Sequence, residues 1–416
     1  MQKNYRCLGC GNTLEFLPDI NKMYCMYCGA SFSVEELHEK EGGHEEEPSA
    51  QANAEVGSTV MESVLNKEEQ RRHATIKMQI LHCNACGAEL AVNDVEASSF
   101  CAYCGQATVV MDRVDDYLQP DYILPFKVTK EQAELTIRNK ISEGFFIPDG
   151  IKQFEVEKLR GIYVPFWLFD VFYGDDQYWK YTVKQGKSSV TRYSHRLGEC
   201  HFQKMTLDAS RNLNDDSSQR LEPYNVKELQ PFEAAYLSGF YSDRFDVGTE
   251  DLKSLAYSRA KVLYDDEAKK TVKHSGAKLH YSNPVRAVTK EEYALLPVWF
   301  LTFRYENMPY TILVNGQTKK MVGAVPYVKK KAIALFAILT VVCCVTFAAI
   351  GAAVTPFVLS DIDGDARIIG AYFGLIGLGI ITTWTTAIKQ YRALNTSIAL
   401  TRSGITSRYV RERQDR

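Results

Sequence analysis

The sequence predicts a multidomain protein with two small zinc ribbons, an α+β middle domain with an antiparallel sheet, and a C-terminal two-helix transmembrane hairpin. Three observations lead to this prediction. Eight of the eleven cysteines form four CxxC pairs, apolar and polar residues alternate between turn signals in the middle of the chain, and two long runs near the C-terminus carry no Asp, Glu, Lys or Arg. The expected order is zinc ribbon 1 at 1–34, an acidic flexible linker at 35–77, zinc ribbon 2 at 78–112, the α+β domain at 113–328, the hairpin at 329–392 and a tail at 393–416.

The cysteine pairs form an internal duplication. Both copies place fourteen residues between their inner cysteines, and an aromatic residue precedes the third cysteine of each copy. A CxxC pair followed by glycine makes a tight knuckle, and two knuckles supply the tetrahedral four-thiolate shell that zinc prefers. We predict two structural zinc ions, held by Cys7, Cys10, Cys25, Cys28, Cys83, Cys86, Cys101 and Cys104.

Such a site has a defined role. Each copy has about thirty residues, too few for a core of its own, so metal binding and folding are expected to be one event. Four protein ligands leave no position for water or substrate, which makes the site structural. A single iron in an electron carrier and a disulfide in each knuckle are the alternatives, and nothing else in the sequence resembles a redox partner site.

The segment 35–77 is acidic and has few residues that can pack, which is typical of a linker. In the middle domain, Thr129 and Gln132 form a capping-box pattern that opens a helix to about Ile141. Thr249 is expected to start a second helix, with Leu252, Leu255 and Leu263 facing inward.

The remainder of the middle domain reads as strands. Residues 161–210 predict a meander with turns at 174–176 and at 185–186. Asn315 and Gly316 separate two strand-like runs and predict a hairpin. The segments 124–126, 164–167 and 296–299 each combine proline with aromatic or aliphatic residues, and either line a ligand pocket or, as we favour, form edge and core.

One further candidate metal site lies in this domain. His195, Glu199 and His201 share parity on an expected strand, so all three point to one face. Alternation on a polar sheet face gives the same pattern by chance. No Gly-rich phosphate loop, GxSxG or HExxH motif is present, so we do not expect an enzyme.

The uncharged runs 332–359 and 368–388 are each long enough to cross a bilayer, and eight residues join them. The alternative is a buried core hairpin. Lysines at 329–331, with Lys389 and Arg392, place the flanks in the cytoplasm by the positive-inside rule. The expected location is the cytoplasmic (inner) membrane, multi-pass, with both termini cytoplasmic and the lipid bilayer as one partner. Neither run contains an ionisable residue, which argues against a pore formed by paired subunits.

The two ribbons, the segments 164–169 and 296–300, the hairpin at 314–318 and the uncharged runs together resemble a family of bacterial membrane-anchored proteins with transcription-factor-IIB-type zinc ribbons. The resemblance implies zinc at the cysteines and anchoring in the cytoplasmic membrane. Some members of that family look like parts of membrane-stress assemblies that contain phage-shock-type or flotillin-like proteins, which suggests such proteins as partners. Members of the family are often labelled helicase-like because of their ribbons. This sequence contains no helicase loop that would support that label.

The predicted function is a membrane-anchored cytoplasmic zinc-ribbon scaffold that recruits protein partners. The alternative is a membrane-tethered zinc-ribbon protein that binds nucleic acid. Residues 78–112 contain no Lys or Arg and four acids, whereas phosphate binding needs clustered cations. This composition favours a protein partner over nucleic acid for the ribbons.

Overall fold

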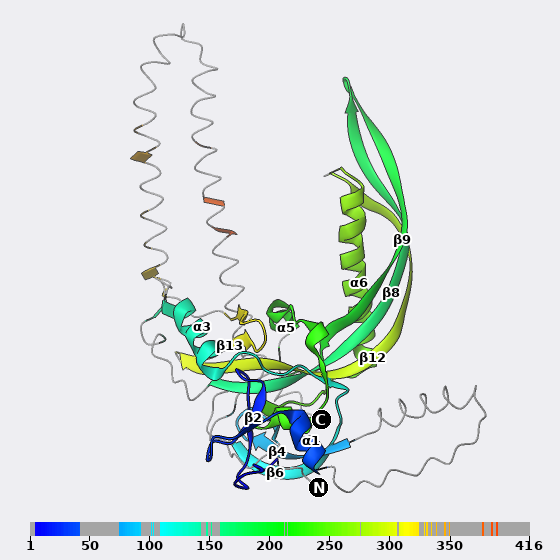
Figure 1. Cartoon of the computed structure of the whole chain (residues 1–416). Coiled ribbons are helices and arrows are strands. Elements are labelled where there is room, and N and C mark those ends of the chain that lie inside the picture. Colours follow the sequence, from blue (N-terminus) through cyan, green and yellow to red (C-terminus); the bar gives the residue numbers. More distant parts are fainter. Residues whose placement is uncertain are drawn as a thin grey trace, which may run out of the picture.

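The computed structural model describes residues 5–41, 75–92, 101, 103, 109–142, 147–148, 151, 159–211, 213, 215–274, 276–305, 308–323, 328 and isolated positions from 330 to 389. This part of the chain is mostly β-sheet. A three-stranded sheet forms the N-terminal ribbon, and an eleven-stranded sheet forms the body and a long arm (Figure 1).

The N-terminal ribbon contains β1 (Glu15–Leu17), β2 (Lys22–Tyr24) and β3 (Ser31–Phe32), paired antiparallel in that order. Helix α1 (Val34–Glu41) follows directly. A capping box starts it: Glu36 N donates to Ser33 Oγ at 3.1 Å, and Ser33 N donates to Glu36 Oε2 at 2.8 Å. This helix lies where the sequence had indicated only an acidic linker.

The large sheet has the order β10-β7-β12-β8-β11-β5-β4-β6, with β9 beside β8 and β13 and β14 beside β12. The second cysteine cluster belongs to this sheet, because its hairpin β4–β5 pairs with β6 on one side and with β11 on the other. The strands are β4 (Thr75–Cys83), β5 (Glu89–Val92), β6 (Val109–Leu118), β7 (Tyr122–Ile123), β8 (Leu159–Gln185), β9 (Ser188–Asp208), β10 (Gln230–Pro231), β11 (Tyr241–Ser242), β12 (Lys278–Tyr305), β13 (Met308–Asn315) and β14 (Met321–Val322).

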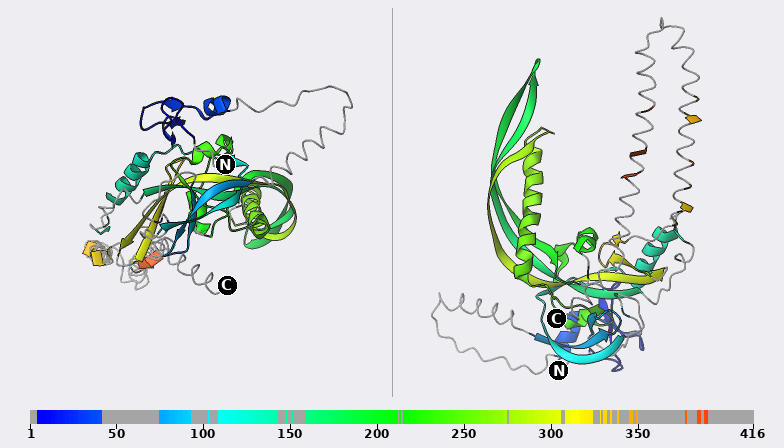
Figure 2. Two further views of the ribbon diagram at one scale, coloured as in Figure 1. Left: turned by 90° about the horizontal axis from the view of Figure 1, so that it is seen from below. Right: turned by 180° about the vertical axis from the view of Figure 1, so that it is seen from behind.

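Three long strands, β9, β8 and β12, continue out of the body as a curved antiparallel arm. Figure 2 shows the arm and the N-terminal ribbon at opposite ends of the molecule. Helix α6 (Thr249–Thr271) covers one face of the arm, and two more helices, α3 (Lys130–Ser142) and α5 (Asp215–Leu221), belong to the body. Two 3₁₀ turns, η2 (Val226–Glu228) and η3 (Ala234–Leu237), lie between α5 and β11.

Helix α6 confirms the predicted helix and two of the three residues predicted to face inward, since Leu255 is partly buried against the same core as Leu252. Leu252 is buried as expected, whereas Leu263 is 43% exposed. The buried positions are Leu252, Ala256, Ala260 and Tyr264, which repeat every four residues. Two alanines in this row let the helix axis come close to the strands, so small residues share the side that faces the sheet with Leu252.

The predicted turn at 174–176 is wrong, because β8 runs through it without interruption. Asp175 is 2% exposed inside the strand. Its carboxyl group accepts hydrogen bonds from Ser282 Oγ at 2.7 Å, from Asn283 N at 2.8 Å and from Gln177 Nε2 at 2.8 Å. An Asp-Asp pair is a turn signal only where the carboxylate bonds locally, and here the neighbouring strand supplies the donors.

Two local predictions are confirmed. Thr129 Oγ1 accepts the backbone N–H of Gln132 at 3.3 Å at the start of α3. The chain reverses at Gly316 between β13 and β14. Buried Asn315 supports this reversal by accepting the N–H groups of Gln317 and Thr318 at 2.8 and 2.9 Å.

The predicted transmembrane hairpin needs correction. Among the residues that the structure describes, no helix has both the length and the apolar character needed to cross a bilayer, and the longest of them, α6, carries charged residues along its length. Most of 332–388 lies outside the described residues. The fold class is therefore corrected to a mainly β protein with cysteine clusters, and the hairpin at 329–392 and the multi-pass membrane location are not supported.

Candidate metal centres

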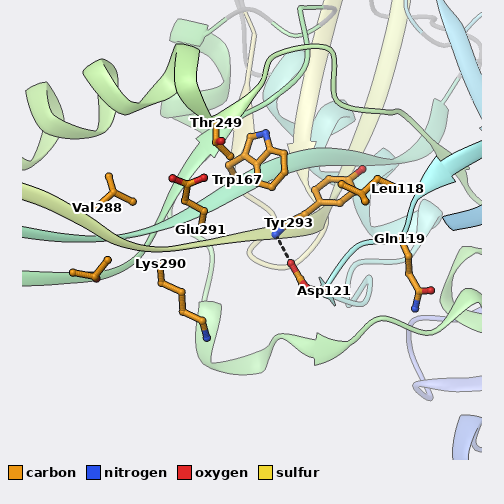
Figure 3. Close-up of a pocket in the computed structure, with 10 residues that line it drawn as sticks. Leu118, Gln119, Asp121, Trp167, Thr249, Val288, Lys290, Glu291 and Tyr293 are labelled. Carbon is orange, nitrogen blue, oxygen red and sulfur yellow. Dashed lines mark hydrogen bonds between the residues drawn. The ribbon is translucent and has the colours of Figure 1, made fainter. Parts of the chain in front are cut away.

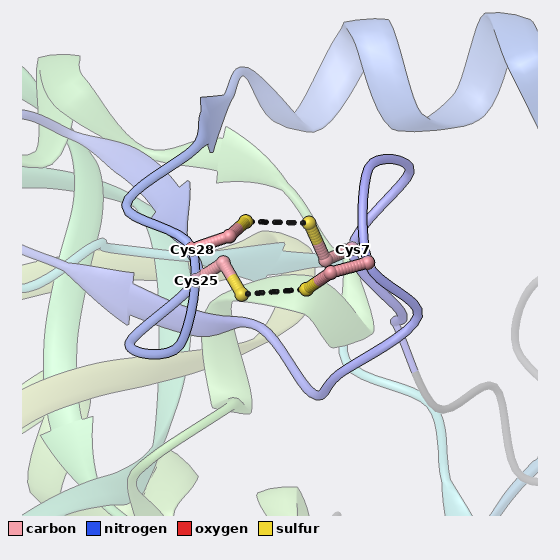
Figure 4. A group of neighbouring side chains, drawn as sticks. Cys7, Cys25 and Cys28 are labelled. Atoms are coloured by element: carbon pink, nitrogen blue, oxygen red, sulfur yellow. Dashed lines mark hydrogen bonds between the residues drawn. The ribbon is translucent and has the colours of Figure 1, made fainter.

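The first cysteine cluster brings four sulfur atoms to one point. The Sγ atoms of Cys7, Cys10, Cys25 and Cys28 all lie within 4.8 Å of one another. The sulfurs form two facing pairs, Cys7 with Cys28 and Cys10 with Cys25, each at 3.5 Å. Figure 4 shows the two contacts as dashed lines, with Cys7, Cys25 and Cys28 labelled. A disulfide has an S–S length of about 2.05 Å, so these contacts are between thiols. A tetrahedral metal with bonds of about 2.3 Å to sulfur separates its ligands by about 3.8 Å, which fits this spacing.

Backbone hydrogen bonds set this geometry. In each knuckle of the first cluster the glycine N–H donates to the carbonyl of the leading cysteine: Gly11 to Cys7 at 2.8 Å and Gly29 to Cys25 at 2.9 Å. The two glycines have φ angles of 74° and 76°, a region that L side chains rarely adopt. The glycine after each CxxC pair is thus required by the turn that aims the sulfurs.

The thiol pKa values in the first cluster diverge. Burial alone would raise the pKa of Cys7, but N–H groups of Cys10 and Gly9 donate to its sulfur and lower that pKa to about 7. The pKa of Cys28 is raised to about 12, since the neighbouring sulfurs of Cys7, Cys10 and Cys25 outweigh the lowering effect of the Ala30 N–H. Four sulfurs this close cannot all ionise without a cation between them. The donor set therefore fits a metal ion.

The second cluster repeats the arrangement inside the body. Cys83, Cys86 and Cys101 have their sulfurs within 4.8 Å of one another, with Cys86 and Cys101 at 3.7 Å. Gly87 N donates to Cys83 O at 2.8 Å, with a φ of 72° at the glycine, as in the first cluster. Both cysteine clusters can therefore bind metal ions. Cys104 lies outside the described residues.

The knuckle tyrosines of the two copies have opposite surroundings. Tyr27 of Cys25–Cys28 is 80% exposed, whereas Tyr103, at the equivalent position of the second copy, is 4% exposed. Tyr103 Oη donates to Asp243 at 2.7 Å, and its ring meets the ring of Phe300 edge-on at 5.3 Å. Burial, followed by the nearby carboxylate of Asp243, raises the pKa of Tyr103 well above its ordinary value. Sequence reasoning missed this anchor, whose only local signal is the tyrosine itself.

The first ribbon exposes further apolar side chains beside its cysteines. Met26 is 68% exposed and Leu8 is 43% exposed, and Cys10 and Cys28 are exposed as well. The ribbon contacts the body elsewhere: Phe16 N donates to Ser238 O at 3.2 Å, and the Phe16 ring packs on Tyr236 at 5.1 Å. The part of the ribbon that carries the two CxxC knuckles is therefore not covered by any other described residues.

The structure places His195, Glu199 and His201 on β9, all exposed on one face. Residues four apart in a strand are about 13 Å apart, which is too far for His195 and Glu199 to share an ion. His195 Nε2 instead lies 2.5 Å from Asp176 Oδ1, and the His201 ring packs against Phe172 at 5.0 Å. In the described part of the chain, only the two cysteine clusters bring three or more such donors together.

A pocket of about 340 Å³ lies where the arm joins the body (Figure 3). Two of its polar groups already have partners: Asp121 Oδ2 accepts Tyr293 N at 2.7 Å, and Trp167 Nε1 donates to Val247 O at 3.0 Å. Phe126, Phe166 and Val298 of the proline-containing segments are fully buried, which confirms their core role, while Trp167 lines this pocket.

Fold and site together define a mainly β protein with two cysteine clusters that can bind metal. The chain is similar to the uncharacterized protein YdjG of Bacillus subtilis (strain 168), with 28% identity over 251 residues, which covers 55% of this chain and 70% of that protein. No family model matches the chain. No solved structure matches it either.

Proposed function

We propose that this chain is a zinc-stabilised scaffold whose first ribbon binds a protein partner. Zinc is the metal that best suits the first site, because four thiolates in two glycine-terminated knuckles form a closed tetrahedral shell. In the second site Cys104 would supply the fourth sulfur. Metal analysis separates zinc from a single iron, since a four-thiolate iron centre is coloured and redox-active.

The observation that supports the docking role is the contrast between the two knuckle tyrosines. In the second cluster, Tyr103 packs into the rest of the body, where its hydroxyl donates to Asp243 and its ring meets the ring of Phe300 edge-on. The first ribbon keeps the same tyrosine, as Tyr27, and exposes it beside Met26 and Leu8. A neighbouring group of exposed apolar residues marks a contact surface more often than scattered ones do. The partner should therefore present a carboxylate next to an aromatic ring.

Nucleic acid is the weaker candidate for the ribbons. The second ribbon has no Lys or Arg between residues 78 and 112, and its knuckle tyrosine is committed to the body. The first ribbon's exposed end carries Tyr27, Met26 and Leu8 beside a single arginine, Arg6, which donates to Gly11 O at 3.3 Å, so the described residues there form no cluster of cations. Phosphate contacts need clustered cations.

The test selects peptides from a phage-displayed random library on the zinc-loaded full chain. We expect selected peptides to pair Asp or Glu with Phe, Tyr or Trp, and to bind Tyr27→Ser and Leu8→Ser at least about tenfold more weakly. Ile20→Ser is the matched control, since Ile20 is 44% exposed and Leu8 43% exposed on the same ribbon. Zinc content is measured for each variant. Peptides that bind all variants equally, or a selection that yields none, would refute the docking role.

A further inference from the structure

The outer part of the arm carries a row of cations with no acids among them. Residues 177–198, which form the β8–β9 tip, contain five Lys or Arg and no Asp or Glu. Residues 268–290, which end α6 and begin β12, contain six Lys or Arg and no Asp or Glu. The chain as a whole has a net charge of −2. The two segments lie side by side, because β12 pairs with β8 from Lys278 opposite Lys180 onward.

Two of these cations face each other without a counter-charge. Lys180 and Lys278 are cross-strand partners, and both are exposed. Neither has a carboxylate partner in the described part of the chain, whereas Lys253, Lys261 and Lys270 on α6 are all in ion pairs. Like charges directly opposite each other in a sheet are destabilising. A bound polyanion would remove this repulsion.

Aromatic rings lie beside these lysines on the face of the arm that α6 leaves uncovered. Tyr178, Tyr193 and Tyr281 are 39%, 52% and 50% exposed. Tyr281, Tyr178 and His195 form one row across β12, β8 and β9, and Tyr193 is the cross-strand partner of Lys180 in the next row. The Tyr178 and His195 rings are stacked at 4.7 Å. The carboxylates nearest on this face are Asp176, which contacts His195, and Glu199.

We propose that this face of the arm binds single-stranded nucleic acid. Exposed tyrosines on a sheet give bases a surface on which to stack, and the flanking lysines contact the phosphates. An anionic lipid surface would use the same lysines. The hairpin tip argues against it, since residues 184–189 read Lys-Gln-Gly-Lys-Ser-Ser and offer no apolar side chain for insertion.

The experiment titrates the zinc-loaded full chain against fluorescein-labelled dT20 and U20 by anisotropy, between 50 and 200 mM salt. An abasic 20-mer with the same phosphates and anionic vesicles of phosphatidylcholine and phosphatidylglycerol serve as comparison probes. We expect binding of the oligonucleotides to weaken steeply with salt. The abasic strand should bind at least about tenfold more weakly, because stacking is lost.

Variants locate the binding to the arm. Tyr193→Ala alone, and Tyr178→Ala with Tyr281→Ala, should each weaken dT20 binding about tenfold or more, while Tyr27→Ala, an exposed tyrosine of the ribbon, should not. Lys180→Gln with Lys278→Gln should reduce the salt slope by about 1.4, and Lys140→Gln on α3 serves as its control. The lysine pair keeps the test valid if a tyrosine variant misfolds, since removing facing like charges does not destabilise the sheet. Equal binding of the abasic strand, binding of vesicles alone, or no binding of dT20 and U20 would overturn the proposal.

Discussion

The two cysteine clusters share one sequence plan but are held in different ways. The first belongs to a separate three-stranded sheet, and two of its four cysteines are exposed. The second is built from strands of the eleven-stranded sheet, and its three described cysteines are all buried, in one apolar cluster with Leu90, Phe166 and Phe300. Metal at the second site should therefore stabilise the body directly. Metal at the first should stabilise the ribbon and should act on the body only through the apolar cluster that the ribbon shares with it, as where Phe16 packs on Tyr236.

The largest expected effect comes from removing one ligand of each site. Cys83→Ser should destabilise the body by about 4 kcal/mol or more, because a metal ligand and buried packing are lost together. Cys10→Ser should unfold the ribbon, since a metal ligand is lost there too, but it should lower the main transition of the body much less, because Cys10 lies in the separate three-stranded part of the structure. Scanning calorimetry with zinc counts per chain measures both. If the two variants lose the main transition equally, the clusters are not energetically distinct.

The sequence predicted the local chemistry of both clusters because knuckle formation depends on neighbours only. The CxxC spacing and the glycine with positive φ can be read directly from residues such as Gly11 and Gly87. The sequence could not predict which of the two cysteine clusters would be buried. Tyr103 meets Asp243 from 140 residues away, and that contact exists only after β11 has aligned beside β5. The same limit explains Asp175, a turn signal whose donors come from β12.

Composition was also a poor guide to the larger architecture. The uncharged runs at 332–359 and 368–388 predicted a membrane hairpin that the structure does not support. In α6, the predicted inward face was right at Leu252 and Leu255 but wrong at Leu263, because the buried row continues through Ala256, Ala260 and Tyr264 instead. Hydropathy reports how apolar a segment is, whereas its environment depends on partners distant in the chain.

An intermediate effect isolates the tyrosine contact. Tyr103→Phe removes the hydroxyl that donates to Asp243, so one donor to a buried carboxyl group is lost and the body should be destabilised by about 1.5–3 kcal/mol. Tyr27→Phe makes the same chemical change on an 80% exposed ring and should alter stability by less than about 0.5 kcal/mol. Urea unfolding followed by near-UV circular dichroism measures the two. If both variants lose a similar amount of unfolding free energy, the hydrogen bond of Tyr103 does not contribute, and the two cysteine clusters differ only in how deeply their tyrosine is buried.

The smallest expected effect concerns the turn that both clusters share. Gly11 has a φ of 74°, and a Cβ added there would meet nothing within 4 Å, so Gly11→Ala carries only the backbone cost of about 1–2 kcal/mol. Because folding of this ribbon and metal binding are coupled, zinc affinity at the first site should fall about 5- to 30-fold while the second site is unchanged. Competition with a chromophoric chelator measures both affinities. Gly11→Asn is the control, since asparagine tolerates positive φ and should lose less; an equal loss in both variants would place the cost in side-chain contacts rather than in the turn.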